Sequence, residues 1–385
     1  MKTVAFVTVN RSDYGLYRSV MEKTIITKNL KPTFWVSGAH FSQKQGFSVN
    51  EIIHDRSPIG EKIRLSDVLD DPAGISQSMA EVTFRFSQAI KRKKPDFLVV
   101  LGDRFEMHAA AVAAIPFVIP IIHIHGGEVT EGAIDNSFRH SITKISHLHF
   151  TSTKEARERI IQMGEEPWRV IVSGAPGLDN VKTVQTFSPQ ELRQKFKLNF
   201  SEAPILVTYH SVTMEFQKTD FYVKQLLSAL GHFKEPILFT APNNDTAGRQ
   251  VRKRIESFIK NHSNSMMVEN LGTRGYFSVL KWARVMVGNS SSGILEAPSF
   301  QLPVVNIGRR QQGRLQAKNV INAPDRSIEI INAIKEGLSV SFRNSLKTLK
   351  NPYGDGNAAE KIVSVLSKVK VDQKLLLKKF YQVKL

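Results

Sequence analysis

The sequence predicts an α/β protein with two doubly wound parallel sheets, because short apolar runs alternate with amphipathic helical stretches along most of its length. Continuous apolar runs are typical of strands in a sheet that is covered on both faces. In the first half, such runs lie at residues 4–9, 34–37, 97–101, 120–124, 148–151 and 170–172. A second series follows at residues 205–209, 237–240, 266–268, 285–288 and 304–307. Two such series indicate two domains.

A polar stretch at residues 179–201 separates the two series. It is of mixed character and follows Gly174-Ala-Pro-Gly177, so the break between the domains is expected there. We therefore expect an N-terminal domain at residues 1–178, a C-terminal domain at residues 179–365 and a basic tail at residues 366–385.

The composition indicates a globular protein with cores of full size. The chain has 385 residues, of which 41% are hydrophobic and 23% charged. It has no cysteine, which excludes disulfides and thiolate metal sites. Its first residues lack the features of a signal peptide, and no apolar stretch approaches the length of a membrane span. The sequence therefore predicts a cytoplasmic protein without a membrane partner.

The net charge of +18 raises the question of a nucleic-acid partner. Much of the excess lies in dispersed lysines and in the tail from Lys368 to Lys384, which follows a helix expected near residues 357–369 and is expected to fray. The mixture of aromatic and basic residues typical of RNA-binding sheets is not visible. The charge therefore favours attraction for an anionic small substrate over nucleic acid.

Polar side chains gather where the predicted strands end, which is where parallel sheets bind ligands. In the first half these positions carry the segments 10–14, 102–104 and 123–128, and in the second half the segments 210–211, 243–245 and 289–296. This agreement predicts a ligand site in a cleft between two facing domains.

The stretch 285–296 predicts a nucleotide site. A strand ends at Gly288, and a helix carrying Glu296 then opens after a cluster of small residues that includes Ser290, Ser291, Ser292 and Gly293. Amide groups at a helix N-terminus and serine hydroxyls form an anion site, and Glu296 lies about one turn later, where it could accept from the hydroxyls of a ribose. The alternative is an ordinary serine-capped helix.

Three arginines could neutralise a diphosphate without a metal: Arg11 after the first strand, and Arg309 and Arg310 after the strand at 304–307. The chain has neither a P-loop lysine motif nor a GxGxxG fingerprint, so ATP and NAD are poorly supported. A nucleoside-diphosphate sugar fits these residues better.

His123, His125 and Glu128 are residue types that bind zinc, and along a strand His123 and His125 would point the same way. However, two glycines follow and no further compact histidine pair is present. The three groups suit acid–base work beside Asp103 better than metal binding.

Asp103 ends a buried strand, where nearby acids could raise its pKa and make it a proton-transfer group. It could instead pair with Arg104 or cap the next helix. Asp135 precedes a helix and could be its N-cap or a catalytic acid. His210 ends the strand at 205–209, where a neutral core histidine is less expected than in the middle of a helix.

Specific motifs are spread over almost the whole chain. They are Asn10-Arg-Ser-Asp-Tyr-Gly15, Gly102-Asp-Arg-Phe-Glu106, His123-Ile-His-Gly-Gly-Glu128, Ile134-Asp-Asn-Ser-Phe-Arg-His140, Thr208-Tyr-His210, Pro242-Asn243, Gly288-Asn-Ser-Ser-Ser-Gly293 with Glu296, and Asn351-Pro-Tyr-Gly354. Together they resemble the hydrolysing UDP-N-acetylglucosamine 2-epimerases of sialic-acid and legionaminic-acid synthesis.

This resemblance implies two Rossmann-like domains of the GT-B type, the first catalytic and the second binding UDP. It implies catalytic roles for Asp103, Asp135 and His210. Some family members carry glutamate at the position of His125, so the acid–base role lies with His125 or with Glu128. The UDP-binding positions map onto Arg11, Asn243, Ser290, Ser291, Glu296 and Arg310. Neither a cofactor nor a metal is implied, and relatives suggest a homo-oligomer, either a dimer or a tetramer.

The implied reaction has two stages. A base removes the C2 proton while UDP leaves C1, and water then adds to the resulting 2-acetamidoglycal, so that the free sugar has inverted C2. The substrate is UDP-N-acetylglucosamine, which we favour on general frequency, or its 2,4-diacetamido-2,4,6-trideoxy analogue. The alternative function is that of a UDP-sugar glycosyltransferase with the same two-domain architecture.

Overall fold

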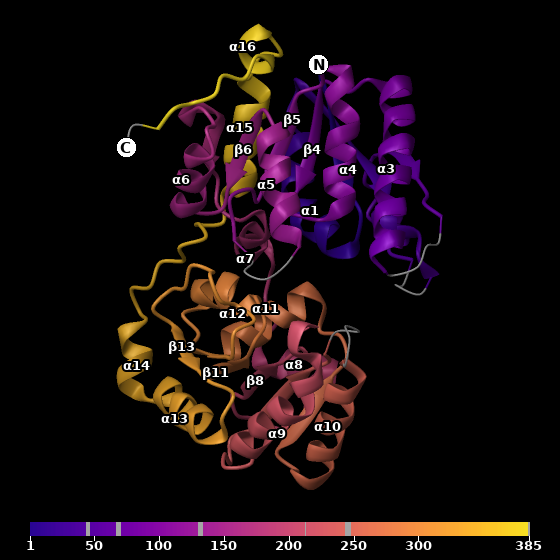
Figure 1. Ribbon diagram of the computed structural model, residues 1–385. Helices are drawn as coiled ribbons and strands as arrows, with labels where there is room; N and C mark the ends of the chain where they lie inside the picture. Colours follow the sequence, from indigo (N-terminus) through magenta and orange to yellow (C-terminus); the bar gives the residue numbers. More distant parts are fainter. Residues whose placement is uncertain (44–46, 67–70, 130–133, 212, 243–247, 384–385) are drawn as a thin grey trace. The chain divides into compact units, whose positions relative to one another are not determined.

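The computed structural model of the chain describes residues 1–43, 47–66, 71–129, 134–211, 213–242 and 248–383. The chain divides into two compact units (Figure 1). The first unit comprises residues 1–180 and 353–385, and the second comprises residues 181–352. Each unit contains its own parallel sheet, which confirms the predicted α/β fold class.

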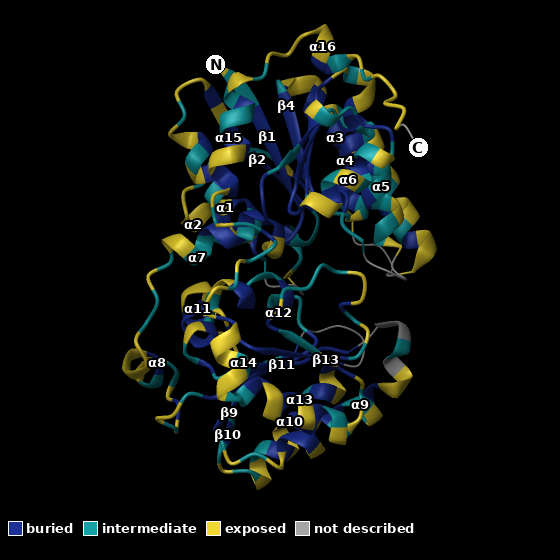
Figure 2. Ribbon diagram, turned by 90° about the vertical axis from the view of Figure 1, so that its left-hand side faces the viewer, coloured by how far each residue is buried: buried dark blue, intermediate teal, exposed yellow. Residues whose placement is uncertain are grey.

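The first unit is built on a seven-stranded parallel sheet with the order β3-β2-β1-β4-β5-β6-β7. Its strands are β1 Lys2–Thr8, β2 Leu30–Ser37, β3 Ile59–Ile63, β4 Phe97–Leu101, β5 Ile121–Ile124, β6 Leu148–Thr151 and β7 Val170–Val172. All residues of β4, β5 and β6 are buried, because helices cover both faces of the sheet (Figure 2). This is the arrangement that a continuous apolar run requires.

The α-helices of the first unit lie between its strands and after the second unit. They are α1 Arg11–Ile25, α2 Val49–His54, α3 Pro72–Lys93, α4 Phe105–Ala114, α5 Asp135–Ile145, α6 Lys154–Gln162, α7 Asp179–Thr183 at the boundary, α15 Ala358–Lys368 and α16 Gln373–Leu376. Asn10 caps α1, Asp71 caps α3 and Thr153 caps α6, each by accepting a backbone amide. Helix α4 packs between α3 and α5, and α1 packs against α15.

The second unit repeats the plan with a six-stranded parallel sheet of order β10-β9-β8-β11-β12-β13. Its strands are β8 Ile205–Thr208, β9 Ile237–Thr240, β10 Ser265–Val268, β11 Val285–Gly288, β12 Val304–Ile307 and β13 Val320–Ala323. Its helices are α8 Pro189–Phe196, α9 Thr219–Leu230, α10 Gly248–Asn261, α11 Gly272–Trp282, α12 Ser292–Leu295, α13 Ser327–Leu338 and α14 Val340–Ser345. Within the described ranges, the structure has no helix with the length and apolar character needed to cross a membrane.

Helix α15 belongs to the first unit, whereas residues up to 365 were expected in the second domain. The Asp179 carboxylate accepts bonds from the first two amide groups of α15, at 2.8 and 2.7 Å. The Lys2 ammonium donates to three carbonyl groups around the last turn of α15, at 2.6–2.9 Å. An amphipathic pattern predicts that a helix buries one face, but not which core covers that face.

The basic tail is bound to the first unit rather than frayed. The buried guanidinium of Arg169 donates to the carbonyl groups of Lys374, Leu375 and Leu377, at 2.8–3.1 Å. The Lys378 ammonium lies 2.8 Å from the buried carboxylate of Glu165. These contacts argue against the tail as a flexible arm for nucleic acid.

Candidate active site

Each sheet reverses its strand order at one point, and in open α/β sheets ligands bind at the carboxyl ends of the strands beside that point. In the first unit the reversal lies between β1 and β4, and in the second between β8 and β11. The predicted catalytic residues Asp103, His125, Glu128 and Asp135 all belong to the first unit, and His210 and the nucleotide-binding residues belong to the second.

Asp103 follows β4 directly after Gly102, whose backbone has a positive φ of 73°. Its carboxylate forms an ion pair with the guanidinium of Arg139, which comes from α5 and is buried. The partner is therefore Arg139 and not Arg104, and the position before α4 is occupied by Arg104, so that Asp103 is not a helix cap either. Burial raises the pKa of Asp103, Arg139 opposes that shift, and the charges of Asp135 and Glu128 add to it.

Asp135 is the first residue of α5, and Ile134 occupies the capping position before it. The capping interpretation of Asp135 is therefore wrong. Arg139 lies one helical turn further along the same face of α5. Helix α5 thus carries two charged residues that act on Asp103 in opposite directions. The carboxylate of Asp135 raises the pKa of Asp103, and the guanidinium of Arg139 pairs with Asp103 and lowers it.

His125 and Glu128 form one hydrogen-bonded pair. His125 Nδ1 lies 2.6 Å from Glu128 Oε1, and both side chains are largely buried. Strand β5 ends at Ile124, and the backbone of His125 is left-handed with a φ of 64°. The expectation that His123 and His125 share one strand face is therefore wrong, because His125 has already left the strand. Nε2 of His125 is buried and has no hydrogen-bond partner among the described residues.

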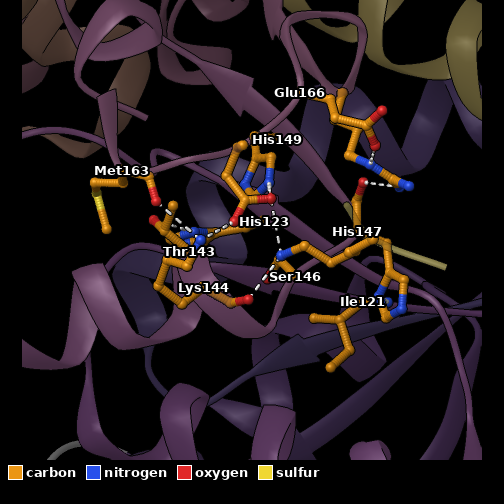
Figure 3. A network of polar contacts seen from close by, with 12 residues as sticks. Ile121, His123, Thr143, Lys144, Ser146, His147, His149, Met163 and Glu166 are labelled. Carbon is orange, nitrogen blue, oxygen red and sulfur yellow. Dashed lines mark hydrogen bonds and ion pairs between the residues drawn. The ribbon is translucent and has the colours of Figure 1, made fainter. Parts of the chain in front are cut away.

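His123 has a structural role in a buried polar network (Figure 3). Its Nε2 lies 2.8 Å from the carbonyl oxygen of Gly102, and its Nδ1 lies 3.4 Å from Thr143 Oγ1. Burial lowers the pKa of His123 to about 3, so the ring is neutral and its Nε2 donates. With both nitrogens engaged, His123 supports the loop before Asp103. Among the described residues, no three His, Asp or Glu side chains are placed to hold a metal ion.

Two further carboxylates, Asp13 and Glu106, are buried, interact electrostatically with Arg104 and are absent from the predicted site residues. Together with Asp103 they form the carboxylate cluster of the first unit. Burial raises the pKa of Asp13 to about 6, although the charge of Arg104 and bonds from the Val9 and Asn10 amides oppose the shift. Burial also raises the pKa of Glu106. Asp13 lies in the motif at residues 10–15 and Glu106 in the motif at residues 102–106. Both motifs follow predicted strands, and this position is the signal that could have identified the two residues.

Arg11 is the first residue of α1, and its guanidinium Nε lies 2.8 Å from the Glu51 carboxylate of α2. Its side chain is largely exposed. The structure therefore places Arg11 at the carboxyl end of β1, but it engages Glu51 rather than the carboxylate cluster.

In the second unit, Gly288 allows β11 to approach β8. A Cβ atom on Gly288 would lie 2.0 Å from the carbonyl oxygen of Thr208, and its φ is 140°. The next residue, Asn289, exchanges two hydrogen bonds with the backbone of His210, both at 2.8 Å. His210 and the serine cluster therefore lie where the strand order reverses, on the loops after β8 and β11, and these two loops are hydrogen-bonded to each other.

The serine cluster surrounds a half-buried glutamate. Tyr276 donates to Ser292 Oγ at 2.8 Å, and Ser290 Oγ accepts the amide of Ser292 at 3.3 Å. Burial raises the pKa of Glu296 to about 7, although a bond from Ser292 and the charge of Arg314 oppose the shift. The predicted helix is only the four-residue α12, so an anion here would depend on local amide and hydroxyl groups more than on a helix dipole.

Gly293 is buried because α12 packs closely on β12: a Cβ atom there would lie 2.8 Å from Val304 Cγ1. The side chains of Arg310 and Gln311 both donate to the carbonyl oxygen of Asn289, at 3.2 and 2.9 Å. Arg310 thus lies beside Asn289, the residue before the serine cluster. Asn243 lies outside the described residues.

Comparison with known proteins gives concordant matches. The family model described as "UDP-N-acetylglucosamine 2-epimerase" matches residues 24–367. A hydrolysing GDP/UDP-N,N'-diacetylbacillosamine 2-epimerase of Campylobacter jejuni is 35% identical over 84% of each chain. A hydrolysing UDP-N,N'-diacetylbacillosamine 2-epimerase of Legionella pneumophila is 32% identical over 98% of each chain. A crystal structure of a UDP-GlcNAc 2-epimerase from Neisseria meningitidis bound to UDP-GlcNAc has a TM-score of 0.80 at 19% identity, covering 95% of this chain and 100% of the other. The last match supports the two-domain Rossmann-like architecture.

Proposed function

This chain belongs to the UDP-N-acetylglucosamine 2-epimerase family, and from that premise we propose how its residues divide the work of a hydrolysing 2-epimerase. The activity, release of UDP from a UDP-2-acetamido sugar with inversion at C2, rests on the relatives that share most of its length. The observation that carries it is the 32% identity to a hydrolysing epimerase over 98% of both chains. A glycosyltransferase function is not supported by these relatives.

The proposed chemistry is an elimination followed by a hydration. A base takes the C2 proton, the C1–O bond breaks, and UDP leaves with the bonding electrons to give a 2-acetamidoglycal. Water then forms a C1–O bond, and an acid returns a proton to C2 on the opposite face. The sum consumes one water molecule and yields UDP and the free sugar, so no redox cofactor is needed. Such a sequence requires acid–base groups whose pKa values lie near the working pH.

The first unit supplies those groups in this proposal. Asp103 has a raised pKa and an ion pair that fixes its orientation, which suits a carboxyl group that exchanges protons. Asp135 and the His125–Glu128 pair are the other candidates, since Asp135 and Glu128 interact electrostatically with Asp103. From the second unit, we assign His210 to stabilising the departing diphosphate or transferring a proton.

The second unit holds the nucleotide in this proposal. Glu296 would accept bonds from the ribose hydroxyls, and Ser290, Ser291 and Ser292 would donate to the phosphates, with Arg310 neutralising their charge. Gly293 contributes by its size, because a side chain there would collide with β12. Arg11 and Asn243 stay predicted nucleotide ligands.

For the substrate we propose the 2,4-diacetamido-2,4,6-trideoxy sugar linked to UDP, in place of the UDP-N-acetylglucosamine favoured from general frequency. The relatives at 35% and 32% identity are both named for N,N'-diacetylbacillosamine. Assembly as a dimer or tetramer and a cytoplasmic location stay predictions.

The test is to incubate purified protein with each of the two UDP-sugars in deuterated water and to follow UDP release and the product by NMR. The diacetamido substrate is expected to react faster, and the free sugar is expected to carry one deuterium at C2. A product without solvent deuterium at C2 would contradict the elimination. UDP release that strictly requires an added acceptor would indicate a glycosyltransferase.

A further inference from the structure

Three side chains of the first unit form a short hydrogen-bonded series that ends at His125. Ser152 Oγ donates to Glu128 Oε1 at 2.6 Å, and the same oxygen lies 2.6 Å from His125 Nδ1. Ser152 is 1% exposed and follows β6, at the turn that leads into α6. The series therefore joins the ends of two neighbouring strands, β5 and β6.

The backbone from His125 to Glu128 folds back on itself, which brings the two side chains into hydrogen-bonding distance. His125 itself adopts a φ of 64°, which a residue with a side chain rarely does, and its amide is held by the carbonyl oxygen of Phe150 at 3.0 Å. A Cβ atom on Gly126 would lie 2.7 Å from His123 Nδ1, and one on Gly127 would lie 2.3 Å from the carbonyl oxygen of Ala156. The two glycines thus let the chain fold back, so that residue 128 reaches residue 125. A strained residue held by its surroundings is a typical feature of functional sites.

The contacts also determine which ring nitrogen carries the proton. An ionised carboxylate can only accept, so Nδ1 of His125 donates to Glu128, and in the neutral ring the lone pair then lies on Nε2. Nε2 is buried and unpartnered in the described part of the chain. A histidine oriented by a carboxylate through Nδ1, with Nε2 left for the reacting proton, is the arrangement of a general base.

We propose that Nε2 of His125 is the atom that exchanges a proton with the substrate, and that Ser152 and Glu128 are positioning residues that act through it. The inference rests on the proposed function. When Nε2 takes the C2 proton, the Glu128 carboxylate stabilises the imidazolium; Nε2 then releases this proton to solvent, because the proton that returns to C2 comes from an acid on the opposite face. Ser152 holds the Glu128 side chain in one rotamer, because its hydroxyl donates to the Oε1 lone pair that His125 does not use. Among the described residues, Glu128 interacts electrostatically with Asp103, which also interacts with Asp135 and pairs with Arg139, and Arg159 donates to the carbonyl oxygen of Gly127.

A double-mutant cycle tests the series. Ser152→Ala is expected to lower kcat roughly tenfold with KM little changed, as for loss of one hydrogen bond to a charged group. Ser152→Thr keeps the hydroxyl and should recover most of that loss. In a Glu128→Gln or His125→Gln background, Ser152→Ala should have almost no further effect, because residues that act as a unit are not additive. Additive effects, or an Ala variant with unchanged kcat, would overturn the series.

Ser146→Ala is a matched control, since Ser146 is also a buried serine of this unit and donates to the carbonyl oxygen of Ile142 at 2.7 Å. Its kcat is expected to equal that of the wild type. If the Ser152 variants do not fold, ¹⁵N NMR of the imidazole rings in wild-type protein decides, with His125→Gln used to assign the signal. Protonation at Nδ1 supports the series, and protonation at Nε2 alone overturns it. Wild-type protein that releases no UDP from either sugar would refute the proposed function instead.

Discussion

The carboxylate cluster of the first unit and the serine–glutamate site of the second unit lie at equivalent positions in their sheets, but they differ in charge and in bonding. In the first unit, Asp13 and Glu106 are buried, Asp103 is partly buried, and all three carboxyl groups have raised pKa values, with arginines lying among them. In the second unit, the contacts join neutral groups such as Tyr276 with Ser292, beside the single carboxyl group of Glu296.

The difference shows that topology alone locates a site without deciding its chemistry. Groups whose pKa values are shifted toward neutrality are suited to proton transfer; the first unit places three such carboxyl groups together, whereas the second-unit site has the single carboxyl group of Glu296 among hydroxyl groups. Neutral donors and acceptors suit recognition of a ribose and a diphosphate. The comparison therefore predicts that catalysis and nucleotide binding can be removed separately.

The largest expected effect is that of Asp103→Asn. The amide has nearly the same shape but cannot accept the proton as a carboxylate does, so kcat should fall by roughly 10²-fold or more. The affinity for UDP should change little, because Asp103 belongs to the first unit. Steady-state kinetics and UDP titration by calorimetry measure both quantities. Loss of UDP binding with kcat retained would reverse the proposed division of roles.

Glu296→Ala should show the opposite behaviour. Removing the acceptor leaves buried ribose hydroxyls unsatisfied, so UDP should bind more weakly by about 1–3 kcal/mol. The same calorimetric titration measures this loss, and circular dichroism checks that the variant is folded. A Glu296→Ala variant with wild-type affinity for UDP would remove Glu296 from the nucleotide site.

A smaller effect concerns the pH dependence of UDP binding. The pKa of Glu296 is raised to about 7 in the free protein, and the ionised form is the one that accepts two hydroxyl groups. Below pH 7, binding must therefore release a proton, and the affinity should fall by up to about tenfold per pH unit as the pH decreases from 7. UDP has its own phosphate ionisation near pH 6, so the measurement is the difference between wild type and Glu296→Gln. Parallel pH profiles for the two proteins would contradict the assignment.

The smallest expected effect is that of removing metal ions. If Arg310 and the serine cluster carry the diphosphate charge, turnover should be unchanged in excess chelator. The rate of UDP release with and without chelator measures this directly. Complete loss of activity that magnesium or zinc restores would show that charge neutralisation in the second unit requires a cation.

Most of the fold was predictable because central strands of parallel sheets are continuous apolar runs. The exceptions are edge strands: β3, with the sequence Ile-Gly-Glu-Lys-Ile, is only partly buried and has no apolar run to recognise. Strand β13 is likewise an edge strand with partly exposed residues. The assignment of α15 to the first unit could not be predicted, since it depends on tertiary contacts of Asp179 and Lys2.

For the candidate site, the residue types and their places after strands were predictable, but their partners were not. Asp103 was considered with Arg104, its neighbour in sequence, and the structure pairs it with Arg139, 36 positions away. The left-handed backbone of His125 was also unexpected, because such conformations are rare for residues other than glycine. Pairing and backbone reversal are tertiary effects, and one sequence carries little signal for them.

The return of α15 to the first unit has a consequence for biosynthesis. Residues 181–352 are made before the segment that completes the first unit, so the second core can form while the first is still unfinished. Until residues 353–383 leave the ribosome, the Asp179 carboxylate and the Arg169 guanidinium lack the backbone groups they bind in the finished protein. The unit whose sheet is synthesised first is therefore the last to be completed.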